Sequence, residues 1–227
     1  MSAFRDIWQG LDWSYILDMV IRVIPSLVCI TLHELSHGIV AYWMGDDTAK
    51  RMGRLTLNPV KHIDWWGLLM MVLFKFGWAK PVPVNMYRFK NPKRGMAITA
   101  LAGPVSNILI TAVCLLLYGI LYRPLYLEGG TVGYIVMELI VTTGFLSVSL
   151  AVFNILPISP LDGSKVLFSF LSDRAYEKLM YIERYGMIIL MVLIATGALS
   201  GVLSSVTGWV FDKLFVIAEI TFDLVNR

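Results

Sequence analysis

The sequence predicts an all-α polytopic membrane protein with about four transmembrane helices, a re-entrant segment that holds a short β-hairpin, and amphipathic terminal helices. Hydrophobic residues fill 57% of the 227 positions and charged residues only 15%, whereas soluble domains carry about 25% charged residues. The apolar residues gather in runs that approach or exceed the roughly 20 residues needed to cross a bilayer. Lys and Arg lie between these runs, so the net charge of +3 is a topology signal and does not indicate a nucleic-acid partner.

The hydropathy pattern predicts transmembrane spans at residues 15–44, 95–122, 132–156 and 185–203. Residues 1–13 are predicted to form an interfacial helix with Trp8 and Trp13 as headgroup anchors. Residues 205–227 alternate apolar and charged positions, which favours an amphipathic or shallow helix, although a final crossing stays open. No internal repeat or separate soluble domain is recognisable, so residues 1–227 are expected to form a single membrane-embedded domain.

The region from residue 50 to residue 85 is expected to hold the re-entrant segment and the hairpin. Arg54–Leu57 has the composition of a short strand, and the apolar run at 65–76 is too short to span a bilayer. Pro81 and Pro83 lack backbone N–H groups, so the chain from Lys80 to Asn85 is predicted to be extended. Irregular backbone at membrane depth is tolerated where it lines a wet cavity. This segment is therefore a candidate wall of a functional site.

A metal-binding pattern lies inside the first predicted span. His33 and His37 are four residues apart and share one helix face, and Glu34 follows the first histidine. This is the H-E-x-x-H arrangement of zinc hydrolases, with two ligands and a general base. The alternative is a chance match whose histidines are core residues. Ionisable residues within a span are costly and usually functional, so we predict a metal site.

A catalytic zinc site usually has three protein ligands and an open position for water. The basic loops at 50–94 and 165–184 indicate that the first and third spans both end on the cytoplasmic side. Asp162 follows the third span on backbone interrupted by prolines, at a depth compatible with His33 and His37, and is the predicted third ligand. The alternatives are that Asp162 belongs to a plain Asp-Gly turn, and that His62 is the ligand.

These residues resemble the site-2 protease family of intramembrane zinc metalloproteases, in a small form without a PDZ or CBS domain. The resemblance covers most of the region from His33 to Gly163 in family order. The matching pieces are His33-Glu34-Leu35-Ser36-His37-Gly38, Gly53-Arg54-Leu55-Thr56-Leu57-Asn58-Pro59, Gly77-Trp78-Ala79-Lys80-Pro81-Val82-Pro83-Val84-Asn85, Gly103-Pro104-Val105-Ser106-Asn107, Asn154-Ile155-Leu156-Pro157 and Leu161-Asp162-Gly163.

The resemblance implies that His33, His37 and Asp162 bind one Zn²⁺ per chain and that Glu34 activates the water. It also implies that Asn154 helps to hold the substrate backbone or the oxyanion. The candidate substrate-binding residues lie in two of the matching pieces: Pro81, Val82, Val84, Asn85 and Asn107. For Asn107 the alternative is a bond to a neighbouring helix at a proline kink.

The expected function is hydrolysis of peptide bonds within or next to transmembrane segments of a membrane protein or peptide, as in regulated intramembrane proteolysis. The family suggests membrane-anchored regulators or signal-peptide remnants as substrates. The protein is expected to be a multi-pass protein of the cell membrane with its active site toward the cytoplasm, and a homo-oligomer is left open. The competing functions are a membrane metal transporter, which would tend to show repeats, and a non-catalytic membrane scaffold, which would not need Glu34.

Overall fold

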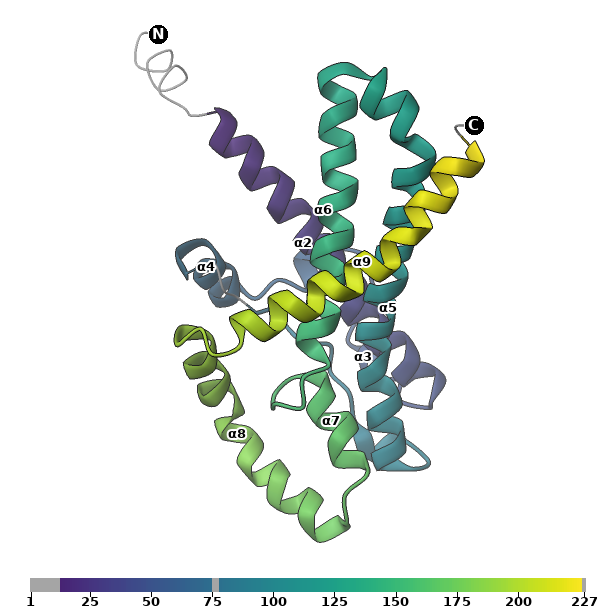
Figure 1. Ribbon diagram of the computed structural model, residues 1–227. Helices are drawn as coiled ribbons and strands as arrows, with labels where there is room; N and C mark the ends of the chain where they lie inside the picture. The colour runs from purple at the N-terminus through teal and green to yellow at the C-terminus, as the bar shows by residue number, and fades with distance from the viewer. Residues whose placement is uncertain (1–12, 75–77, 226–227) are drawn as a thin grey trace, which may run out of the picture.

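The computed structural model describes residues 13–74 and 78–225, and long helices dominate it (Figure 1). The long helices are α2 (Trp13–Trp43), α5 (Pro92–Leu121), α6 (Gly130–Asn154), α8 (Asp173–Ala195) and α9 (Ser200–Val225), and all of them except α8 pack into the central bundle. Shorter helical elements connect them: α3 (Thr48–Arg51), η1 (Pro59–Lys61), α4 (Trp65–Phe74), η2 (Met86–Arg88), η3 (Tyr122–Leu127) and α7 (Asp162–Ser169). The predicted helical class is confirmed.

Among the described residues, four helices are long and apolar enough to cross a membrane, and three of them match predicted spans. These three candidate spans are Ile21–Trp43, Pro92–Leu127 and Gly130–Asn154, and the fourth is Ser200–Val225. The prediction put the fourth crossing at 185–203 instead. There the helix ends at Ala195, Gly197 adopts a left-handed backbone with φ of +68°, and α9 begins at Ser200. The expected interfacial helix at 1–13 lies outside the described residues, except for its last one.

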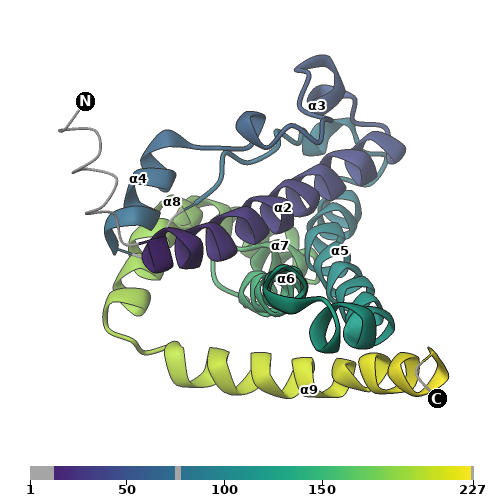
Figure 2. The same ribbon diagram turned by 90° about the horizontal axis from the view of Figure 1, so that it is seen from above.

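Helix α5 is the centre of the bundle, because it packs against α2, α6, α7 and α9. Seen from above, α6 lies between α2, α5 and α9 (Figure 2). Small or polar residues recur every four positions on α5, and all of them are buried: Gly95, Thr99, Gly103, Asn107 and Thr111. Such a row of small residues lets helix backbones approach closely. The close approach of α2 and α5 positions the site described below.

The expected β-hairpin is reduced to a single antiparallel bridge between Ile63 and Ala79, and the described residues contain no strand. The amide of Lys80 donates to the carbonyl of His62, at 2.9 Å. After this bond Pro81 and Pro83 have no N–H to donate, so a ladder cannot continue. Residues 80–85 form no helix, in keeping with the prediction, and the backbone of Asn85 is extended. The strand expected at Arg54–Leu57 is not formed.

The third candidate span ends at Asn154, and an irregular loop then leads to α7. The start of α7 folds back on the end of α6 so closely that a Cβ atom on Gly163 would lie 2.1 Å from the carbonyl oxygen of Ile155. Glycine is therefore required next to Asp162 for a packing reason, and Asp162 becomes the first residue of α7.

Candidate active site

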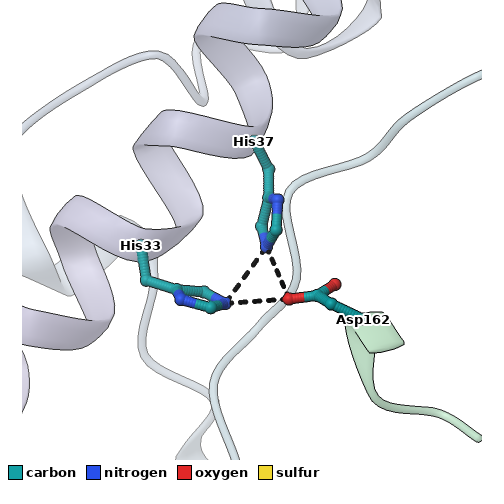
Figure 3. A group of neighbouring side chains, drawn as sticks. All are labelled: His33, His37 and Asp162. Carbon is teal, nitrogen blue, oxygen red and sulfur yellow. Dashed lines mark hydrogen bonds and ion pairs between the residues drawn. The ribbon is translucent and has the colours of Figure 1, made fainter. Parts of the chain in front are cut away.

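The histidines of the H-E-x-x-H pattern lie in the continuous helix α2 and point to the same side (Figure 3). One helical turn separates them, and their rings meet edge to face with centroids 4.6 Å apart. Both side chains are buried although the helix is membrane-spanning in length. Burial of two imidazoles in an apolar helix is costly unless they share a polar partner.

Asp162 is that partner, and it points at the two rings from the start of α7 (Figure 3). Its Oδ2 atom lies 3.2 Å from Nε2 of His33 and 3.1 Å from Nε2 of His37. The two Nε2 atoms are 3.1 Å apart. The three donor atoms thus form a nearly equilateral triangle. The structure brings together the three residues that the sequence predicted as metal ligands.

The protonation state of this triangle favours a cation. Nδ1 of His37 lies 2.7 Å from the carbonyl oxygen of Thr99. A carbonyl can only accept, so Nδ1 carries the proton and Nε2 of the neutral ring presents a lone pair. Burial acts to raise the pKa of the Asp162 carboxyl, but the two neighbouring imidazoles, when they are protonated, outweigh burial and hold that pKa below the ordinary value. The carboxylate is therefore ionised at neutral pH.

These donor atoms fit a zinc ion. Zinc–nitrogen and zinc–oxygen bonds of about 2.0–2.1 Å in a tetrahedron require ligand atoms about 3.3 Å apart, close to the separations found here. Oδ2 of Asp162 is buried and has no hydrogen-bond donor among the described residues. Two imidazoles and one carboxylate also leave the fourth corner of the tetrahedron open, as in a catalytic site.

Gly103 of α5 is the residue that makes room for this arrangement. A Cβ atom there would lie 2.5 Å from Cε1 and 2.6 Å from Nε2 of His33, and 2.6 Å from Cε1 of His37. In the sequence, Gly103 stands out only as the first residue of the Gly103–Asn107 piece, which carries the family resemblance and a proline kink. The spacing of small or polar residues at every fourth position of α5 is the sequence signal that predicts the close approach of α2 and α5.

Glu34 is tied to the extended segment that the sequence predicted as a wall of the site. Its Oε2 atom accepts a hydrogen bond of 2.8 Å from the backbone N–H of Val82. Its Oε1 atom has no partner in the described part of the chain. One carboxylate oxygen is thus held in place, and the other is left for proton transfer.

A cavity of about 240 Å³ connects these groups. The predicted site residues that line it are His33, Glu34, His37, Pro81, Val82, Val84, Asn154 and Asp162. Met96, Thr99, Ala100, Pro160 and Lys165 complete the lining, and no pattern in the sequence marks them as site residues. Lys165 lies one turn after Asp162, with its Nζ atom 3.8 Å from Oδ1.

Two predicted substrate-binding residues and the alternative ligand lie elsewhere. Asn107 is fully buried one turn beyond Gly103, and its carbonyl accepts from the hydroxyl of Ser147 on α6. The side chain of Asn85 caps η2, and its backbone N–H donates to Oδ2 of Asp46, at 2.6 Å. Neither residue lines the cavity. Asn107 packs against α6, and Asn85 belongs to the turn that begins η2. His62 donates from Nε2 to the carbonyl of Thr56 and borders a separate small cavity.

The geometry is that of a metallopeptidase, with potential metal ligands from two helices, one of which is a candidate membrane span. Comparison with protein families identifies the group. The model of peptidase family M50 matches residues 22–196, which include every residue of the site. The chain belongs to peptidase family M50.

Individual relatives agree with this assignment. A protein of Bacillus subtilis (strain 168) named as a zinc metalloprotease, YwhC, is 39% identical over 185 residues, which cover 77% of this chain and 80% of that protein. The protein named as zinc metalloprotease Rip2 is 29% identical in Mycolicibacterium smegmatis, over 88% of this chain and 76% of the relative. The protein of the same name in Mycobacterium tuberculosis (strain H37Rv) is 27% identical, over 90% of this chain and 77% of the relative. No solved structure matches.

Family, ligand triangle and apolar helices together make the chain an intramembrane zinc metalloprotease. This confirms the resemblance recognised in the sequence. It also decides against the metal transporter and the non-catalytic scaffold.

We predict that Gly103→Ala strongly reduces zinc binding while the helices stay folded. The added methyl group would meet the outer atoms of two flexible imidazole rings, which can rotate away but then no longer point at a common centre. Zinc per chain in purified protein, measured by mass spectrometry, checks this. Gly208→Ala is the control, since a Cβ there meets nothing within 4 Å. A Gly103→Ala protein with full zinc content would contradict the packing argument.

Proposed function

We propose that the chain hydrolyses peptide bonds within or next to transmembrane segments of membrane-anchored substrates, as in regulated intramembrane proteolysis. His33, His37 and Asp162 are the zinc ligands in this proposal, and Glu34 is the general base. The observation that carries it is the convergence of the three donor atoms within 3.1–3.2 Å of one another, in a cavity that also contains Glu34.

Zinc, when bound, supplies a water of lowered pKa and polarises the scissile carbonyl. Glu34 accepts the proton of the attacking water on Oε1 and returns it to the leaving nitrogen. Its hydrogen bond to Val82 keeps the carboxylate oriented during both transfers. Thr99 holds His37 in the tautomer that binds metal, because its carbonyl fixes the Nδ1 proton.

Asn154 is the proposed oxyanion donor. It is the last residue of α6, lines the cavity and uses one side-chain N–H to bond the carbonyl of Leu150, at 3.0 Å. The second hydrogen of the amide group is left to donate to the developing negative charge.

The segment from Lys80 to Asn85 is the proposed docking edge for an unwound substrate strand. Pro81 and Pro83 have no N–H, and the N–H of Val82 is bonded to Glu34. Val84 lines the cavity, and its N–H has no partner in the part of the chain that the structure describes. It is thus the free donor for pairing by strand addition.

The proposed location is the cell membrane, with the cavity toward the cytoplasm. The basic stretches at 50–94 and 165–184 belong to the end of the molecule with α3, α7 and α8, opposite the turn between η3 and α6 (Figure 1). Positive residues favour the cytoplasmic side. We also retain the re-entrant position of α4, supported by its ten-residue length and the exposed side chains of Trp65 and Trp66, which suit a membrane interface.

Glu34→Gln is predicted to retain zinc and to lose cleavage of a model transmembrane substrate by about 100-fold or more, because general acid–base catalysis contributes that much. Asp162→Ala, by comparison, removes a ligand and should lower the zinc content itself. Zinc analysis and cleavage assays on the same preparations separate the two effects. Cleavage at the normal rate by Glu34→Gln would exclude Glu34 as the base.

Replacing Val84 with proline tests the docking edge. The substitution removes the free N–H, and the loss of one hydrogen bond should raise KM about threefold to tenfold with zinc content unchanged. Val84→Ala is the matched control, because it shortens the side chain and keeps the N–H. Equal KM values for the two variants would argue against strand addition at this residue.

A further inference from the structure

The extended segment from Lys80 to Asn85 cannot be held in place by a sheet. Among the described residues, β-pairing here is limited to the bridge at Ala79 and the bond from the N–H of Lys80 to His62, and the two prolines interrupt any ladder beyond it. An extended chain without such bonds would be free to move, because ordering each residue costs about 1–2 kcal/mol. Something other than strand pairing must fix this wall of the catalytic cavity.

Charged side chains from three other places bond to its backbone. The guanidinium of Arg54 donates from Nη2 to the carbonyl of Lys80, at 2.8 Å. Glu34 accepts from the N–H of Val82, at 2.8 Å, and Asp46 accepts from the N–H of Asn85, at 2.6 Å. The segment is thus held at its start, its middle and its end.

Arg54 is the least expected member of this set. Only 7% of its surface is exposed, although arginine is rarely buried unless it is paired. No carboxylate lies within ion-pair distance among the described residues, and its Nε atom is buried without a partner. A buried charge in such surroundings costs stability. The burial of Arg54 must therefore be offset by its hydrogen bond to the carbonyl of Lys80 and by the order that this bond gives to the segment.

The neighbouring residue links Arg54 to the metal-binding helix. A Cβ atom on Gly38 would lie 2.5 Å from Cδ2 of Leu55 and 3.1 Å from Cγ1 of Val82. Leu55 and Val82 therefore pack against α2 directly beside His37. Arg54 spans from this contact to the carbonyl that precedes Pro81.

We propose that Arg54 is a positioning residue, which holds the start of the segment so that Val82 meets Glu34 and Val84 faces the cavity. This inference rests on the proposed role of the segment in substrate binding. Arg54 does not line the cavity, so it acts through Lys80 and not on the substrate. A backbone carbonyl replaces the usual carboxylate partner, and the bond is charge-assisted.

The test compares Arg54→Gln, Arg54→Lys and Arg51→Gln in full-length protein reconstituted in lipid. Arg51 is the matched control, since it lies three residues away and makes an exposed ion pair with Asp47. For each protein, zinc content is measured together with KM and kcat on a model transmembrane peptide. The split between these quantities distinguishes a positioning role from a general loss of structure.

Arg54→Gln is expected to keep its zinc and to raise KM about tenfold or more, the usual effect of losing a hydrogen bond to a charged group. Arg54→Lys should restore part of the affinity, and Arg51→Gln should match the unmodified protein. An unchanged KM in Arg54→Gln, or loss of its zinc, would overturn the proposal. If Arg54→Gln does not fold, Arg54→Lys decides: a raised KM supports the proposal, and a normal KM overturns it. Absence of zinc or cleavage in the unmodified protein would instead refute the proposed function.

Discussion

The site depends on the close contact between α2 and α5. Two histidines on α2 can face a carboxylate from α7 only if the helix opposite them leaves space, and Gly103 leaves it. The same contact lets the carbonyl of Thr99 reach His37 and fix its proton. Placement of the ligands and selection of the tautomer therefore have one cause, the row of small residues on α5.

Prolines and glycines give this helical protein its irregular backbone where the chemistry needs it. The loop after α6, with Pro157 and Pro160, ends the helix and lets Asp162 begin a new one that turns back toward the histidines. Pro81 and Pro83 keep the other wall extended and leave few free donors on it. Charged side chains then bond this wall in place of a sheet, and one of them is the proposed base itself.

The sequence predicted the helical class, three of the four spans and the three converging ligands, because these follow from local patterns. Two histidines four apart on a helix share a face wherever the helix goes, and the order of the spans indicated that Asp162 lies near the same end of the bundle as these histidines. The helix expected at 185–203 ends at Ala195, because Gly197 divides an apolar run that hydropathy alone reads as continuous. A hairpin was expected at 50–85, but only one bridge forms among the described residues, because residue composition does not show which backbone groups find a partner.

The partners of backbone atoms could not be predicted, because they depend on how distant segments pack. Nothing local indicates that Glu34 bonds Val82, or that Arg54 is buried. The motif around Asn107 likewise predicted a site residue, whereas in the structure Asn107 is buried against α6 and its carbonyl accepts a hydrogen bond from Ser147.

X-ray absorption at the zinc edge, on purified protein in a lipid bilayer, measures the ligand set of His33, His37 and Asp162. The account predicts only nitrogen and oxygen neighbours at about 2.0–2.1 Å, with the outer scattering pattern of two imidazole rings. A sulfur neighbour at about 2.3 Å, which only a cysteine or methionine of this chain could provide, or scattering from fewer than two imidazoles, would contradict it.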